Sequence, residues 1–223
     1  MNPPREAAWW PRTARELEAS LPDPAAAWLA GARAAVREDP AAVDGLFAVA
    51  ARRCGRTALD GRTGPAGWGT DDAARVLLLA ALPLRGAELA AAATRLYRVA
   101  GAAERRAVLR ALSLPELSSA LAETALPLVE DALRTNDPRL IRAALGPYGA
   151  AHLDAHAFRQ AVLKCVFVGI PLAGVSGLDE RADGELARMM ADFATERRAA
   201  ARPVPPDVLA FLHSHPAPTE ATT

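Results

Sequence analysis

Apolar side chains recur at spacings of three and four residues along much of the chain, which is the period of a helix that buries one face. Leu186, Met190 and Phe193 form one such stripe near the C-terminus. With the turn residues between them, these patterns predict helices near 24–38, 40–54, 70–82, 86–100, 103–112, 115–125, 127–135, 138–145, 154–168 and 184–201, and a short last helix ending at Leu212.

The starts of several predicted helices share one chemistry, an Asp followed by a Pro. The pair occurs at 23–24, 39–40 and 137–138. An Asp before the first turn accepts hydrogen bonds from unpaired backbone N–H groups, and Pro needs no such partner at the first helical position. Thr70 and Asp154 are predicted to cap helices in the same way. The glycine-rich segment 55–69 and the segment 169–183 are predicted to be loops.

Composition supports a fold made of helices alone. The chain of 223 residues holds 54 alanines and 29 leucines, against 13 valines and two isoleucines. Ala and Leu favour helices, whereas β-branched residues favour strands. We therefore expect an all-α single domain of short antiparallel helices, packed as an irregular HEAT-like α–α superhelix without a sheet. The expected boundaries are an N-terminal arm over 1–22, the domain over 23–212 and a disordered tail over 213–223.

Charge and cysteine usage exclude several classes of function. The 26 basic and 26 acidic residues cancel, so the chain lacks the basic excess of a dedicated nucleic-acid binder. No apolar run is long enough to span a membrane, and the N-terminus does not resemble a secretion signal.

Cys54 and Cys165 are expected to be free thiols in the cytoplasm. His152 and His156 are four residues apart but lack a third ligand, so we expect no metal and no cofactor.

Lys164 is the only lysine among 26 basic residues, the others being arginines. An arginine-rich, alanine-rich composition is typical of a GC-rich genome, in which a neutral lysine would drift to arginine. Lys164 is therefore a candidate for chemistry that needs a compact ammonium, although a surface lysine retained by chance explains it as well. Arg197 extends the apolar stripe of its helix, so it needs an anionic partner or a position at the helix end.

Several segments in order resemble the EboA family of metabolite-traffic proteins, over residues 70–209 and most densely over 130–209. The segments that carry the resemblance are Ala73–Leu79, Leu96–Arg98, Arg134–Asn136, Pro147–Tyr148, Val162–Lys164, Phe167–Leu172, Gly177–Ala182, Glu185–Met189, Glu196–Arg197 and Ala200–Val204. The sequence differs from the family pattern at Phe158, Arg159, Thr195, Arg198 and Ala210.

The resemblance implies a role in moving a secondary-metabolite precursor, with a small-molecule metabolite, other proteins of the same gene cluster, or both as partners. It makes Lys164 part of a shared Val-Leu-Lys pattern and identifies no catalytic residue. The candidate ligand- or partner-binding residues are Arg134, Asn136, Tyr148, Gln160, Lys164, Asp179, Arg181, Arg197 and Arg202.

Three functions follow from these observations. The first is a non-catalytic helical protein that binds a metabolite or a partner. The second is an enzyme for a small anionic or carbonyl substrate, with Lys164 as base, Arg197 as anion holder and Asp179 as orienter. The third is a helical adaptor whose polar residues are structural. We also expect Lys164 to pair with an acidic residue of 177–185, Asp179 first, and a convergent pocket would favour the first two functions.

Overall fold

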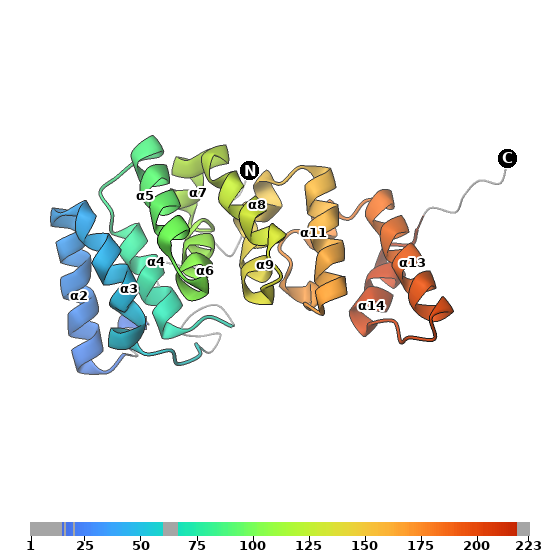
Figure 1. The fold of residues 1–223 in the computed structure, drawn as a ribbon, viewed down its shortest axis with the longest axis horizontal. Coiled ribbons are helices and arrows are strands. Elements are labelled where there is room, and N and C mark those ends of the chain that lie inside the picture. The colour runs from blue at the N-terminus through green and yellow to red at the C-terminus, as the bar shows by residue number, and fades with distance from the viewer. Residues whose placement is uncertain (1–14, 16, 20, 60–66, 218–223) are drawn as a thin grey trace. The chain divides into compact units, whose positions relative to one another are not determined.

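The computed structural model describes residues 15, 17–19, 21–59 and 67–217 (Figure 1). Most of the predicted N-terminal arm, the centre of the predicted loop at 60–66 and the part of the predicted tail at 218–223 lie outside the described residues. The last helix continues to Ser214, two residues into the predicted tail over 213–223. The all-α fold is confirmed, since the described chain contains helices and one isolated bridge between Ala58 and Gly69, but no strand. Within that chain, no helix is both long enough and apolar enough to cross a membrane.

The contacts divide the chain into two compact units, Met1–Val129 and Glu130–Thr223, and each is described by itself. The predicted domain boundaries and the HEAT-like array stay predictions. The helices of the first unit are α2 (Asp23–Glu38), η2 (Pro40–Ala42), α3 (Val43–Cys54), α4 (Thr70–Ala80), α5 (Gly86–Val99), α6 (Ala102–Ala111), α7 (Pro115–Leu121) and η3 (Ala122–Ala125).

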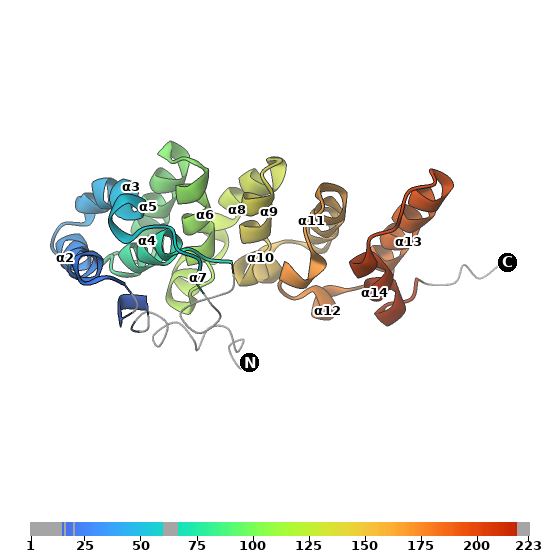
Figure 2. The ribbon, with the colours of Figure 1, turned by 90° about the horizontal axis from the view of Figure 1, so that it is seen from below.

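Helix α4 forms the centre of the first unit. It packs against α2, α3 and α6, and Figure 2 shows it enclosed among them. Every residue from Thr70 to Leu79 is buried. A helix that is buried on all sides has no solvent face for its polar residues, so the charged side chains it carries must find partners inside the unit.

The second unit begins within α8 (Leu126–Arg134) and has its core around α11. Its other helices are α9 (Pro138–Ala144), α10 (Pro147–His152), α11 (Ala155–Val168), η4 (Leu172–Gly174), α12 (Leu178–Arg181), α13 (Gly184–Ala199) and α14 (Pro206–Ser214). Helix α11 packs on α9 and α13, and α13 lies beside α14 (Figures 1 and 2). The short helices α10, η4 and α12 were not predicted, because three to six residues are too few to show a period.

Three of the predicted helix caps are confirmed. The carboxylates of Asp39, Asp137 and Asp154 accept from the backbone N–H groups of Ala41 at 3.0 Å, Arg139 at 2.9 Å and Ala157 at 2.7 Å. The cap at Asp39 starts the short η2 turn, and α3 follows it at Val43. At the other end of α11, Gly169 takes the left-handed conformation, with φ +74°, and stops the helix as predicted.

Two predicted caps are wrong. Helix α2 starts one residue earlier than predicted, with Pro22 at its N-cap, so Asp23 lies in the first turn and caps nothing. There its charge still faces the positive end of the helix dipole. Helix α4 begins at Thr70 itself, and Asp72 makes the capping bond instead, accepting from the backbone N–H of Gly69 at 3.0 Å.

Candidate functional site

Lys164 binds backbone carbonyl groups rather than a carboxylate. Its Nζ donates to the carbonyl oxygens of Leu133 and Thr135, both at 2.7 Å, where α8 ends. The last carbonyls of a helix lack partners within the helix, and a cation placed there also opposes the negative end of the helix dipole. The predicted pair with Asp179 is therefore wrong, because the ammonium is directed at α8 and Asp179 is exposed on α12.

Arg181 makes the same kind of contact with α10. Its guanidinium donates to the carbonyl oxygens of Ala150 at 2.6 Å and Leu153 at 2.8 Å, around the end of that helix. The guanidinium also lies 4.2 Å from the centre of the buried Phe158 ring, a cation–π distance. Arg181 therefore joins α10, α11 and α12, and two of its five N–H donors are used in doing so.

The predicted residues Tyr148, Arg134, Asn136 and Gln160 do not line the groove that is described below. Tyr148 is 2% exposed, and its ring centre lies 4.3 Å from that of His152. Arg134, Asn136 and Gln160 are exposed, and Arg134 makes only a long contact of 3.9 Å with Asp131. Lys164 thus lies near Arg134 and Asn136, because it binds the carbonyl oxygens of their neighbours Leu133 and Thr135. The contact is with backbone atoms and not with the side chains of Arg134 and Asn136.

A groove in the second unit contains the two remaining predicted residues, Arg197 and Arg202. Its volume is about 560 Å³, which is within the usual range for small-molecule sites. It lies between the end of α11, the last turns of α13 and the segment that leads to α14. The lining residues are Val166, Phe167, Gly169, Phe193, Glu196, Arg197, Ala200, Arg202 and Pro205.

The apolar part of the groove is dominated by Phe167. Phe167 is 63% exposed, whereas its neighbour Phe193 is 6% exposed. The two rings meet edge to face, with centres 5.1 Å apart and an angle of 86° between their planes. Covering a large exposed aromatic ring with another apolar group is favourable, because apolar surface is removed from water.

The polar part of the groove is formed by Arg197, Arg202 and Glu196. Arg197 donates through Nε and Nη2 to the carbonyl oxygen of Pro203, at 3.0 and 2.8 Å, and its guanidinium lies 5.9 Å from the centre of the Phe193 ring. These contacts fix the side chain at the groove. The side chains of Arg202 and Glu196 are exposed and make no hydrogen bond or ion pair within the described part of the chain.

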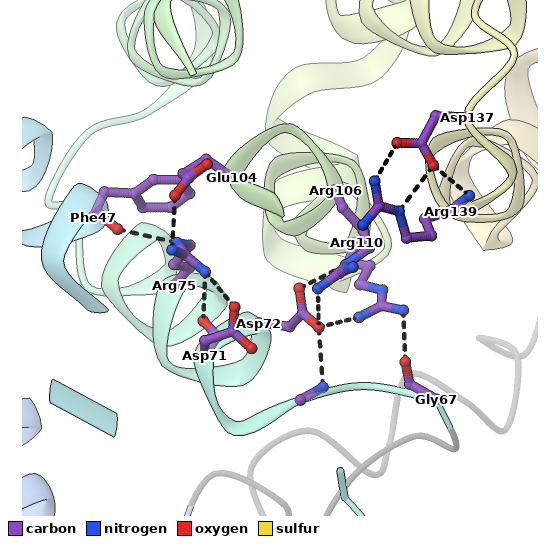
Figure 3. A network of polar contacts seen from close by, with 11 residues as sticks. Phe47, Gly67, Asp71, Asp72, Arg75, Glu104, Arg106, Arg110, Asp137 and Arg139 are labelled. Atoms are coloured by element: carbon purple, nitrogen blue, oxygen red, sulfur yellow. Dashed lines mark hydrogen bonds and ion pairs between the residues drawn. The ribbon is translucent and has the colours of Figure 1, made fainter. Parts of the chain in front are cut away.

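A second charged cluster, which the sequence analysis missed, lies inside the first unit (Figure 3). Arg75 is 0% exposed and binds the carboxylates of Asp71 at 2.7 Å and Glu104 at 2.9 Å, and the carbonyl oxygen of Phe47 at 3.0 Å. The spacing of four residues between Asp71 and Arg75, inside an otherwise apolar segment, was the available signal.

Asp72 continues this cluster on the other side of α4. Arg106 and Arg110 both donate to its carboxylate, which is 1% exposed and also accepts the capping bond from Gly69. Arg110 additionally donates to the carbonyl oxygen of Gly67 at 2.9 Å (Figure 3). With each carboxylate paired, the cluster satisfies buried charges that would otherwise be costly, so we interpret it as structural.

The two histidines for which no metal was expected, and the two cysteines, do not form a reactive cluster in the described residues. The His152 ring lies tilted against that of Tyr148, and His156 is exposed. No group of three potential metal ligands occurs in the described ranges. Cys54 and Cys165 are free and buried. Burial raises the pKa of the Cys54 thiol to about 11 and that of Cys165 to about 12, so both stay protonated and poorly nucleophilic at neutral pH.

The sequence was compared with known protein families. Residues 18–213 match the family model described as "Metabolite traffic protein EboA". The chain belongs to the EboA family. No curated protein and no solved structure matches it. The EboA match spans both compact units, so it includes the buried cluster around Arg75 as well as the groove.

Proposed function

We propose that this EboA-family chain binds a metabolite non-catalytically in the groove of its second unit, as part of metabolite traffic. The observation that carries the proposal is the exposed Phe167 ring on the wall of a groove of about 560 Å³ that also holds two arginines. The description of the family supports a role connected with a metabolite. A groove of this size suits a small molecule rather than a protein partner.

The enzymatic alternative has less support. It requires Lys164, Arg197 and Asp179 to act on one substrate, and of these three residues only Arg197 lines the groove. Two of the three Nζ donors of Lys164 bind carbonyl oxygens, and Arg197 is fixed on Pro203. The helical-adaptor alternative agrees with these structural contacts, but it gives no reason for a large aromatic ring left exposed beside two arginines.

Native mass spectrometry of the protein purified from its own host tests the proposal. We expect a bound species of constant mass on the wild type, lost in Phe167→Glu, because a carboxylate on the groove wall removes the apolar contact and repels an anion. Val99→Glu is the matched control, since Val99 is 80% exposed in the first unit and lies outside the groove. A wild type without any bound species, or one retained equally in Phe167→Glu, would overturn the proposal.

A further inference from the structure

We infer that the groove takes an aromatic monoanion, with a flat ring against Phe167 and a carboxylate or sulfonate at Arg202 and Arg197. This inference rests on the proposed function and adds the chemical class of the ligand. It is carried by two independent features of the groove, the net charge of its wall and the exposure of its aromatic surface.

The charge of the wall favours one negative charge on the ligand. Arg197 and Arg202 contribute two positive charges and Glu196 one negative charge, which leaves a net charge of +1. A neutral ligand would leave Arg202 without an ionic partner, as it is within the described chain. A dianion would bring a second charge towards Glu196, and like charges at short distance repel. A single acidic group therefore matches this wall best.

Both arginines of the groove have N–H donors available for an anion. Arg197 is held by its two bonds to Pro203 and by the Phe193 ring, yet its Nη1 makes no hydrogen bond within the described residues. A guanidinium fixed in this way loses little entropy when it binds an anion. Arg202 is exposed and adds a second donor group on the same groove.

The apolar surface favours a flat ring. Phe167 meets Phe193 edge to face, and 63% of the residue is still exposed to solvent. Small or compact residues, Gly169, Ala200 and Pro205, form other parts of the lining, so a planar group can approach closely. Aromatic groups gain from stacked or edge contacts as well as from burial of area.

Two fluorescent probes separate the ring from the charge. 8-Anilinonaphthalene-1-sulfonate is an aromatic monoanion, and N-phenyl-1-naphthylamine has the same rings without the sulfonate. We expect the wild type to bind the sulfonate more tightly. Arg202→Gln should weaken sulfonate binding about fivefold and leave the neutral probe unchanged, as expected for one exposed ion pair. Phe167→Ala should weaken both probes about fivefold.

A third variant should act in the opposite direction. Glu196→Gln removes the negative charge from the wall, so the sulfonate should bind a few times more tightly and the neutral probe equally. General loosening of the structure would not produce this charge-selective gain. Arg188→Gln, on the same helix but outside the groove lining, is the control and should change neither probe.

The outcomes distinguish this inference from the proposed function. If both probes bind with a dependence on Phe167 but Arg202→Gln and Glu196→Gln change nothing, the groove binds apolar molecules and the inference of a monoanion is wrong. If neither probe binds, or if Phe167→Ala changes neither, the binding groove itself fails. Equal weakening by Arg188→Gln and Arg202→Gln would show a general effect of charge and would also overturn the inference.

Discussion

Arg75 in the first unit and Arg202 in the second carry the same guanidinium, but their surroundings differ completely. Arg75 is 0% exposed and bonded to two carboxylates and a carbonyl oxygen, whereas Arg202 is exposed with no side-chain partner in the described chain. The first arginine has no capacity left for a ligand, since its partners already satisfy it. The second keeps its donors available. In an arginine-rich chain, partner count and burial separate structural cations from candidates for binding.

The largest effect is expected from breaking the buried cluster. Arg75→Met leaves the buried Asp71 carboxylate and Glu104 without their cation, which should lower the free energy of unfolding by about 3–5 kcal/mol. Urea unfolding followed by tryptophan fluorescence measures this, because all four tryptophans lie in the first unit.

The matched control for that variant is Arg95→Met. Arg95 pairs with Asp44 in the same unit, but the two side chains are 47% and 50% exposed, so its loss should cost under about 1 kcal/mol. If both variants unfold at the wild-type urea concentration, burial of the Arg75 cluster contributes little, and the distinction between the two classes of arginine is unsupported.

A smaller effect is expected at Lys164, where the cation binds carbonyl oxygens in a half-buried position. Lys164→Met removes two charge-assisted hydrogen bonds, and the carbonyls of Leu133 and Thr135 regain only part of them from water. We expect a loss of about 2 kcal/mol in urea unfolding followed by circular dichroism. Gln160→Met, on the exposed face of the same helix, should change stability by under about 0.5 kcal/mol. Equal midpoints for both variants would show that the α8 contact is not stabilising.

The Lys164 contact also shows what the sequence could and could not predict. The all-α fold and most helix bounds followed from composition, periodicity and Asp caps, because these are local properties of the chain. The partner of Lys164 did not follow, since every residue has a carbonyl group and a backbone acceptor leaves no trace in the sequence. A carboxylate such as Asp179 was the only kind of partner that the sequence could suggest.

The groove was predicted only in part for a similar reason. Arg197 and Arg202 were among the candidates, but Phe167 was not, because periodicity does not show which aromatic residue stays exposed at a helix end. The cluster around Arg75 was not predicted, although Asp71 and Arg75 have helical spacing. The residues after Arg75 are apolar and indicate a core helix, and periodicity does not show which charged side chains such a helix buries. Long-range partners such as Glu104 depend on how α4 and α6 pack.

A pH-dependent effect is expected from the exposed cap of α13. The pKa of Asp183 is lowered, first by hydrogen bonds from the Arg159 guanidinium and then by the backbone N–H of Leu186. Because the folded pKa lies below the unfolded value of about 3.9, this stabilisation is present above about pH 4 and is lost as the pH falls through the folded pKa.

Asp183→Asn tests this pH dependence. Asn still caps the helix, so the loss at pH 7 should be under about 1 kcal/mol, and it should shrink as the pH falls from 5 to 3. Urea midpoints at pH 7, 5, 4 and 3 measure it. Asp179→Asn is the control, since Asp179 is exposed and has no side-chain partner in the described residues, and this variant should unfold at the wild-type urea concentration at pH 7. A gap for Asp183→Asn that widens on acidification would contradict the assignment.

The smallest effect is expected at Arg188, which makes the comparison with Arg75 sharpest. Like Arg75, Arg188 binds two carboxylates, those of Glu185 at 2.8 Å and Asp192 at 2.6 Å. Unlike that of Arg75, its side chain is 53% exposed, so water can solvate both carboxylates when the guanidinium is removed. Arg188→Gln should therefore leave the urea midpoint of the second unit unchanged by circular dichroism, at low and at high salt alike. Since the two arginines match in number and type of anionic partners, a loss at Arg188 as large as that at Arg75 would mean that partner count, and not burial, decides which arginines are structural.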